Sequence, residues 1–291
     1  MNVLDQLNQL NLHLENLILI LLPLELFRRW RKGQLNRPCV QEMLASVSPL
    51  IPTLLLDGAY TAYMTLAFMA CYQLAPIHIP TTLFTVIPAF LLVDLLSYIE
   101  HRFAHEVRLY WAMAHSVHHS SPQYDQTIGL RISFVDGFTA PIFYLPAFLI
   151  GFDPLLIVSL ITFVLVYQQW IHTETVGRLP WLDPWLNTPS NHRVHHGVQT
   201  QYLDKNFGAV LIIWDRLFGT YEREEETVIY GLTHPIQSVN PWVVHTFEAS
   251  RLWQDIQQAT RWQDRIQYLF RHPGWQPAPA IDPQLGRQPA N

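Results

Sequence analysis

Nine of the fourteen histidines lie between residues 101 and 196, and they fall into short, repeated spacings. One pair is four residues apart, two clusters read HxxHH, and one histidine stands alone after an apolar run: His101 and His105; His115, His118 and His119; His192, His195 and His196; His172. Residues three and four apart share one face of a helix, so each cluster can aim two or three imidazole nitrogens at one point. Nine nitrogens are too many for one metal ion and suit two.

The ligand types narrow the choice of metal. Neutral imidazole binds iron, copper and zinc, and the two cysteines, Cys39 and Cys71, are too few and too scattered for a thiolate site. Zinc hydrolases use three protein ligands and an open position, and their HExxH signature is missing from this sequence. A pair of irons can activate O₂. The residues therefore favour an iron-dependent lipid oxidase, with a non-catalytic, zinc-binding membrane protein as the alternative from another class.

Composition places this chemistry at a membrane. The chain is 49% apolar and only 14% charged, whereas ordinary globular chains are about 25% charged. The formal net charge of −5 provides no basic surface for nucleic acid. We therefore expect a membrane protein with no nucleic-acid partner.

The elements that must position the histidines are apolar and helical. Crossing a bilayer takes about 20 residues of helix, and four segments are candidates: residues 50–74, 82–98, 138–152 and 155–170. The last two are joined at Gly151, Asp153 and Pro154 and predict a tight hairpin. The sequence thus predicts an all-α integral membrane protein with about four transmembrane helices and a cytoplasmic, histidine-rich cap that holds two irons.

The orientation follows from a basic patch at residues 28–32, which favours the cytoplasmic side. Every second crossing then returns to that side and delivers the next histidines there. We therefore expect a multi-pass membrane protein with its active site on the cytoplasmic face. The apolar run at residues 17–24 is too short to span alone and predicts an interfacial helix.

Four regions result. Residues 1–44 are expected to form the interfacial helix and basic segment, and residues 45–247 the membrane-embedded catalytic domain. Residues 248–272 show apolar residues at helical spacing, which predicts one amphipathic helix on the membrane or on the cap. Residues 273–291 are rich in Pro and Gln and predict a disordered tail.

Several other polar residues are candidates for contacts around the metal ligands. Asp94 precedes His101 by seven residues and His105 by eleven, so it shares their helical face and could orient an imidazole. Glu106 directly follows His105. Three more candidates are Asn191, Asp204 and His234. The remaining histidines, at positions 13, 78, 245 and 272, are expected to be bystanders.

The blocks HRFAH, HSVHHSS and NHRVHHG, with the lone histidine in WIHT, resemble the fatty acid hydroxylase/sterol desaturase superfamily of membrane diiron enzymes. The resemblance covers about residues 90 to 240 and is closest to the alkylglycerol monooxygenases. It implies two irons held by the nine histidines. Some members have a further histidine four residues before the lone one. Here that position is Gln168, so water or a side-chain oxygen would complete the coordination.

The resemblance also implies a reaction. The irons would use O₂ and two electrons from an external donor to hydroxylate or desaturate a lipid C–H bond. The donor would be a tetrahydropterin or a reductase of the ferredoxin or cytochrome type. In an alkylglycerol-type ether lipid, the carbon attacked is next to the ether oxygen. A sterol or a fatty-acyl chain is the alternative substrate within the superfamily.

Overall fold

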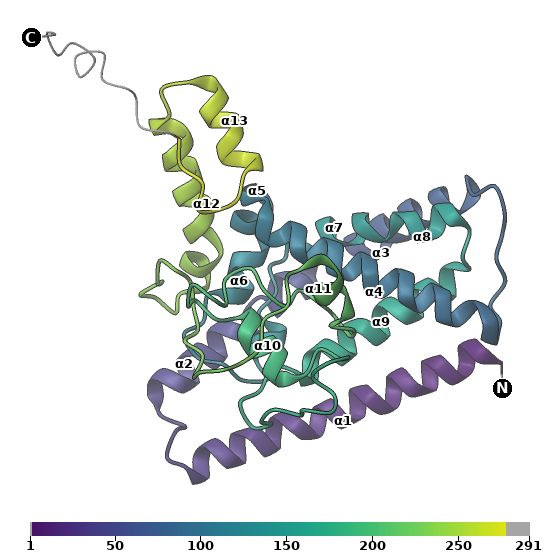
Figure 1. Cartoon of the computed structure of the whole chain (residues 1–291), viewed down its shortest axis with the longest axis horizontal. Helices are drawn as coiled ribbons and strands as arrows, with labels where there is room; N and C mark the ends of the chain where they lie inside the picture. Colours follow the sequence, from purple (N-terminus) through teal and green to yellow (C-terminus); the bar gives the residue numbers. More distant parts are fainter. Residues whose placement is uncertain (1, 278–291) are drawn as a thin grey trace, which may run out of the picture.

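The computed structural model describes residues 2–277, and helices form the fold (Figure 1). In chain order the elements are α1 Val3–Arg31, α2 Arg37–Val47, α3 Leu50–Gln73, α4 Leu83–Glu106, α5 Arg108–Tyr110, η1 Trp111–His115, α6 Ser116–His119, η2 Ile128–Leu130, α7 Asp136–Thr139, η3 Ala140–Tyr144, α8 Leu145–Ile150, α9 Pro154–Trp170, α10 Pro189–His195, α11 Ile213–Phe218, α12 Pro241–Gln258 and α13 Trp262–Phe270. Within residues 2–277 the extended chain forms only isolated bridges and no sheet. The predicted all-helical class is confirmed.

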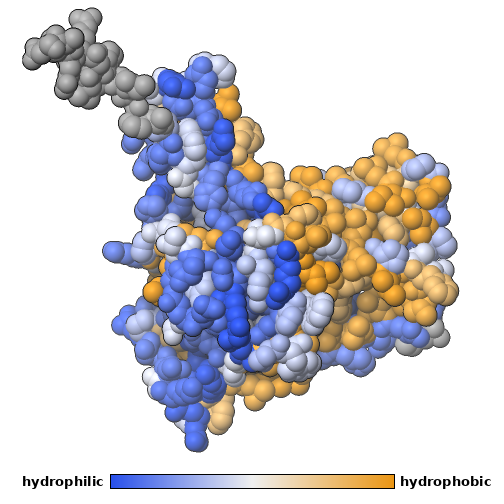
Figure 2. Space-filling model, viewed as in Figure 1, coloured by the Kyte–Doolittle hydropathy of each residue, from blue (hydrophilic) through white to orange (hydrophobic). Residues whose placement is uncertain are grey.

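A bundle of α3, α4, α8 and α9 makes the apolar half of the molecule, and α1 lies along α9. Its core consists of apolar side chains that these helices bury against one another, among them Phe68, Val93, Phe148, Leu156 and Leu160. The outer surface of this half is also apolar, as the orange side of Figure 2 shows. Exposed apolar side chains around an apolar core suit a surrounding of lipid.

Three helical stretches are long and apolar enough to cross a membrane: Val3–Arg31, Arg37–Gln73 and Leu83–Glu106. Two of the four expected crossings, at residues 50–74 and 82–98, overlap the second and third of these almost completely. The other two are shorter apolar helices, Asp136–Ile150 and Pro154–Trp170. By helix length and composition, the structure thus has three candidate membrane spans among the described residues, and not the four expected.

The first stretch is longer than the sequence predicts. Instead of a short interfacial helix around residues 17–24, α1 has 29 residues and continues through Pro23 to Arg31. Its polar residues have partners on α9, because Asn11 Nδ2 donates to the Ser159 carbonyl and Ser159 Oγ donates to Asn8 Oδ1. The polar residues before the apolar run therefore lie inside a packed helix.

The polar half contains the ends of α4 and α9, together with α10, α11 and long irregular segments (Figures 1 and 2). The basic end of α1 lies here too, since Arg28 Nη1 donates to Thr175 Oγ1. The segments that carry the nine candidate ligands all lie in this half.

The C-terminal region forms two helices where the sequence predicts one amphipathic helix over residues 248–272. α12 already begins at Pro241, capped by the Asn240 side chain, and α13 follows a break at residues 259–261. The two helices stand out from the bundle as an arm (Figure 1). Most of the tail predicted to be disordered, residues 278–291, lies outside the described residues.

Candidate metal centre

All nine histidines come together at the polar end of the bundle, and eight of them are buried. His101 and His105 end α4, one turn apart. His115, His118 and His119 follow in η1 and α6, His172 lies just beyond α9, and the last three lie on α10 and its C-cap. Their nitrogens form two groups, each within 4.8 Å: His101, His105, His115, His119 and His195; and His118, His172, His192 and His196.

Each HxxHH cluster divides between the two groups. Adjacent residues on a helix point about 100° apart, so His118 and His119 face different groups, as do His195 and His196. In the first cluster a π-helical turn at Trp111–His115 also precedes the regular turn of α6, and such turns are frequent at functional sites. Each cluster therefore aims two of its nitrogens at one group and the third at the other.

The spacing of the nitrogens matches that of ligands around metal ions. Neighbouring Nε2 atoms are 2.9–3.2 Å apart in both groups, for the pairs His101–His115, His105–His119, His115–His119, His119–His195, His118–His172, His172–His192 and His192–His196. An ion with metal–nitrogen bonds of about 2.1 Å places adjacent ligand nitrogens roughly 3 Å apart. The two groups also touch, with the His119 and His196 rings stacked at 4.3 Å.

Main-chain carbonyls fix the tautomer of three of these rings. Nδ1 of His101, His172 and His195 donates to the carbonyl oxygens of Phe207, Gln168 and Lys205, respectively, at 2.9–3.0 Å. A neutral ring that donates from Nδ1 has a lone pair on Nε2. Lone pairs that face one another at 3 Å repel unless a cation lies between them. The donor set therefore fits a metal ion in each group.

Burial keeps these rings neutral, as ligands must be. Burial, together with the neighbouring histidines, lowers the pKa of the ligand candidates in η1, α6 and α10 and its C-cap well below the ordinary value: His115, His118, His119, His192, His195 and His196. Burial also lowers the pKa of His172 to about 4. At neutral pH the lone pairs are available to metal.

Asp94 has a different role from the expected one. Its buried carboxylate accepts hydrogen bonds from the Val210 and Leu211 amides and from Trp214 Nε1, so its partners come from α11 and the segment before it and not from a histidine. Asp94 thereby fixes the segment that carries the Phe207 carbonyl. The prediction that it orients an imidazole directly is wrong.

Asp204 lies beside the five-histidine group. Its Oδ1 is 3.4 Å from His105 Nδ1, and its Oδ2 accepts a hydrogen bond from His272. His272, expected to be a bystander, is thus part of the surroundings of the site. Glu106 instead pairs with Arg102 on the exposed side of α4, and His234 lines a neighbouring pocket.

Two other candidates make hydrogen bonds that involve main-chain carbonyls. Asn191 is buried and donates to the carbonyls of Asp183 and Leu186, which holds α10 in place. Gln168 supplies its main-chain oxygen to His172.

Sequence reasoning missed Asp215, which holds the same segment as Asp94. Its carboxylate accepts hydrogen bonds from the Phe207 and Gly208 amides and from Thr220 Oγ1. Gly208 has no room for a side chain, because a Cβ there would lie 2.6 Å from the Leu211 oxygen and 2.9 Å from Asp215 Oδ2. The sequence feature that could have identified Asp215 is its position directly after the apolar run IIW.

A second missed feature joins α1 to the four-histidine group. Glu25 accepts hydrogen bonds from the Gln126 amide and Thr173 Oγ1, and Arg29 donates to the Tyr124 carbonyl. Tyr124 packs against the rings of His172 and His196, at 5.9 and 5.1 Å between centroids. The buried end of α1 therefore fixes the loops that surround this group.

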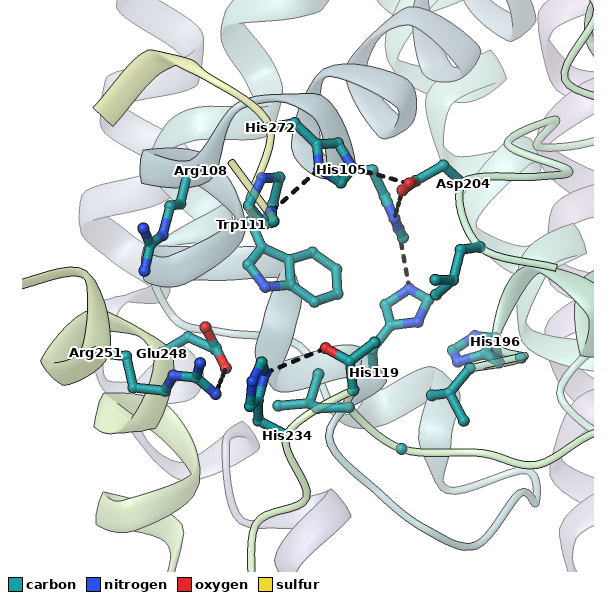
Figure 3. A pocket seen from close by; sticks show the side chains of 18 of the residues that line it. His105, Arg108, Trp111, His119, His196, Asp204, His234, Glu248, Arg251 and His272 are labelled. Atoms are coloured by element: carbon teal, nitrogen blue, oxygen red, sulfur yellow. Dashed lines mark hydrogen bonds and ion pairs between the residues drawn. The ribbon is translucent and has the colours of Figure 1, made fainter. Parts of the chain in front are cut away.

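A pocket of about 410 Å³ opens beside the five-histidine group. His105, His119 and His195 form part of its wall, together with Trp111. Figure 3 shows Glu248 and Arg251 of α12 across the pocket from His105 and Asp204. A molecule bound here would contact the candidate metal ligands directly.

Comparison with known proteins agrees with this geometry. Residues 86–220 match the family described as fatty acid hydroxylase. The alkylglycerol monooxygenases of Danio rerio and Homo sapiens are 45% and 43% identical to this chain over 198 residues, 68% of this chain and 43% of each relative. That of Xenopus tropicalis is 39% identical over 274 residues, 92% of this chain and 59% of the relative.

This chain spans about half the length of these curated relatives. No solved structure matches it. The family match contains all nine histidines and the two aspartates that hold the segment with the Phe207 carbonyl, Asp94 and Asp215. Residues 86–220 are therefore a domain of the fatty acid hydroxylase family.

Proposed function

We propose that this chain is a membrane-bound diiron oxygenase that uses O₂ to hydroxylate a C–H bond of a lipid, with an alkylglycerol-type ether lipid as substrate. The convergence of nine histidines into two adjoining groups carries the proposal. The relatives named alkylglycerol monooxygenase support the substrate class. The apolar helices would place the site beside a pool of lipid.

One iron would be held by the five-histidine group and the other by the four-histidine group. When bound, the iron pair would supply the activation of O₂. The chain holds the ligand rings in one tautomer through main-chain carbonyls, as at His101 and His195, and supports His105 through Asp204. Burial of the histidines excludes bulk water from the reacting groups.

The overall reaction balances with an external reductant. The lipid C–H bond, O₂, two electrons and two protons give an alcohol and water. On the carbon next to an ether oxygen, the alcohol is a hemiacetal, which collapses to an aldehyde and a free glycerol hydroxyl. A tetrahydropterin or a ferredoxin- or cytochrome-type reductase would supply the electrons.

We also propose that the site faces the cytoplasm. Arg28, Arg31 and Lys32 lie at the end of α1, and Arg28 contacts Thr175, just beyond His172. Basic residues at the end of a spanning helix favour the cytoplasmic side. The histidine groups lie at the same end.

The test is turnover by the full chain in lipid nanodiscs, loaded with iron and supplied with heavy-isotope O₂, an alkylglycerol and each donor in turn. The proposal expects O₂ uptake and formation of the aldehyde, with the heavy isotope incorporated. His118→Ala should abolish turnover, whereas His13→Ala, at an exposed position on α1, should not. Oxidation only of sterols or acyl chains would contradict the substrate class. A protein that binds only zinc and consumes no O₂ with any donor would contradict the enzyme itself.

A further inference from the structure

The exposed face of α13 is apolar. Trp262, Ile266 and Phe270 are spaced four residues apart on one side of the helix and are 66%, 46% and 62% exposed. The opposite side is buried, with Tyr268 packed against Leu252 of α12 and against Ala259 just after it. A short helix that buries one face and exposes three large apolar side chains on the other has an apolar surface without a protein partner among the described residues.

The position of α13 suggests what covers this surface. The Arg108 amide donates to the Arg271 carbonyl, so the end of α13 adjoins the start of α5. That start lies just past Glu106, where the spanning candidate α4 ends. Leu109 and Met113, four residues apart on α5 and η1, are 38% and 43% exposed. The end of α13 thus adjoins a segment with exposed apolar residues at the point where α4 ends.

The figures show the same arrangement. In Figure 1, α13 lies on the side of the arm that is turned toward the apolar half of the molecule, and α12 lies on the other side. Figure 2 shows apolar atoms on that edge of the arm and hydrophilic atoms over the rest of its visible face. The apolar edge of the arm is therefore turned toward the apolar surface of the bundle.

The charges on α13 fit a lipid surface with anionic headgroups. Arg261, Arg265 and Arg271 are exposed, while Asp264, the one acidic residue of the helix, is buried beside Arg261. Apolar aromatic side chains flanked by arginines are typical of helices that lie in the headgroup region.

From these features we propose that α13 lies on the lipid surface and seats the C-terminal arm there through Trp262, Ile266 and Phe270. The segment that follows α13 lines the pocket beside the histidines, through Pro273, Gly274 and Gln276. Seating α13 on the lipid surface therefore fixes one wall of the pocket close to the membrane, where a lipid could enter from the side.

The test places an environment-sensitive fluorophore at position 266 in the full chain. Ile266→Cys is compared with Gln254→Cys, an exposed position on the side of α12 away from α13. Both proteins carry Cys71→Ser, because Cys71 is partly exposed and would react with the label. Cys39 is kept, because it is buried and poorly accessible. Both proteins are placed, one chain per disc, in nanodiscs of phosphatidylcholine and phosphatidylglycerol. Quenching is measured with a nitroxide near the top of the lipid acyl chain and with aqueous iodide.

We expect the label at 266 to lose most of its fluorescence to the lipid nitroxide and little to iodide, and the label at 254 to do the reverse. Equal exposure of both labels to iodide would overturn the proposal. Shielding at 266 that appears only with two chains per disc would overturn it as well, because a second copy would then cover the face. Metal content equal to that of the parent shows that each variant is folded, and Phe270→Cys repeats the measurement if Ile266→Cys is not.

Discussion

Asp204 Oδ2 accepts a hydrogen bond of 2.8 Å from His272 Nε2, while its Oδ1 lies beside His105 Nδ1. The carboxylate thereby connects the segment after α13 to the five-histidine group. The hydrogen bond from His272 to Asp204 raises the pKa of His272. Among residues 2–277, Asp204 is thus the one carboxylate that lies next to a candidate ligand ring in the way typical of metal sites.

The first prediction concerns this contact. Asp204→Asn keeps the shape but removes the charge that favours the Nδ1–H form of His105, so metal affinity should fall by about 10–100-fold. Competition with a chelator measures the change. The matched control is Glu106→Gln, because Glu106 is adjacent to His105 in sequence but pairs with Arg102. Equal losses in both variants would show that the position of Asp204 is unimportant.

The second prediction concerns the buried end of α1. Arg29→Met removes the cation beside Glu25 and Asp125, whose side chains are 4% and 2% exposed. Leaving buried carboxylates unpaired should cost about 3–5 kcal/mol, seen as a lower unfolding temperature. Arg31→Met, at an exposed position on the same helix, should have little effect. If the two variants unfold alike, α1 does not support the site in this way.

The third prediction concerns Gly208. Gly208→Ala forces the segment that carries the Phe207 carbonyl away from Leu211 and Asp215, at a cost of about 1–3 kcal/mol. Because that carbonyl holds His101, the five-histidine group should lose metal more readily. Gly177→Ala is the control, since a Cβ there has open space. Unchanged stability and metal retention in Gly208→Ala would contradict the account.

The fourth prediction concerns orientation. Glu225→Cys places a thiol at an exposed position in the polar half. In intact cells a membrane-impermeant maleimide should leave it unlabelled, and permeabilisation should make it reactive. Labelling of intact cells would place the histidine groups on the outer face.

The histidine spacings were enough to find the candidate ligands, because the short distances between ligands on one helix are set by helical geometry alone. Helical geometry did not reveal that each HxxHH cluster divides, because that also depends on the π-helical turn at Trp111–His115 and on what lies opposite each residue. Asp94 shows the same limit. The sequence placed Asp94 on the helix face that carries His101 and His105, but its hydrogen-bond partners are more than a hundred residues away.

The helix boundaries that sequence reasoning missed have related causes. Glu25 and Arg29 looked like the polar end of a short apolar run, yet distant buried partners allow α1 to continue through them. The break between α12 and α13 has neither Pro nor Gly at residues 259–261, and the apolar spacing continues across it. Tertiary contacts decided the first boundary, and no local signal marks the second.

The central claim is that nine histidines hold two irons, and the metal content of the purified chain tests it most directly. Elemental analysis after expression with iron should give two irons per chain, one for each group. His172→Ala, in the four-histidine group, and His101→Ala, in the five-histidine group, should each lose iron, and His13→Ala should retain both ions. A single ion per chain, zinc in place of iron, or two irons retained in both ligand variants would contradict the account.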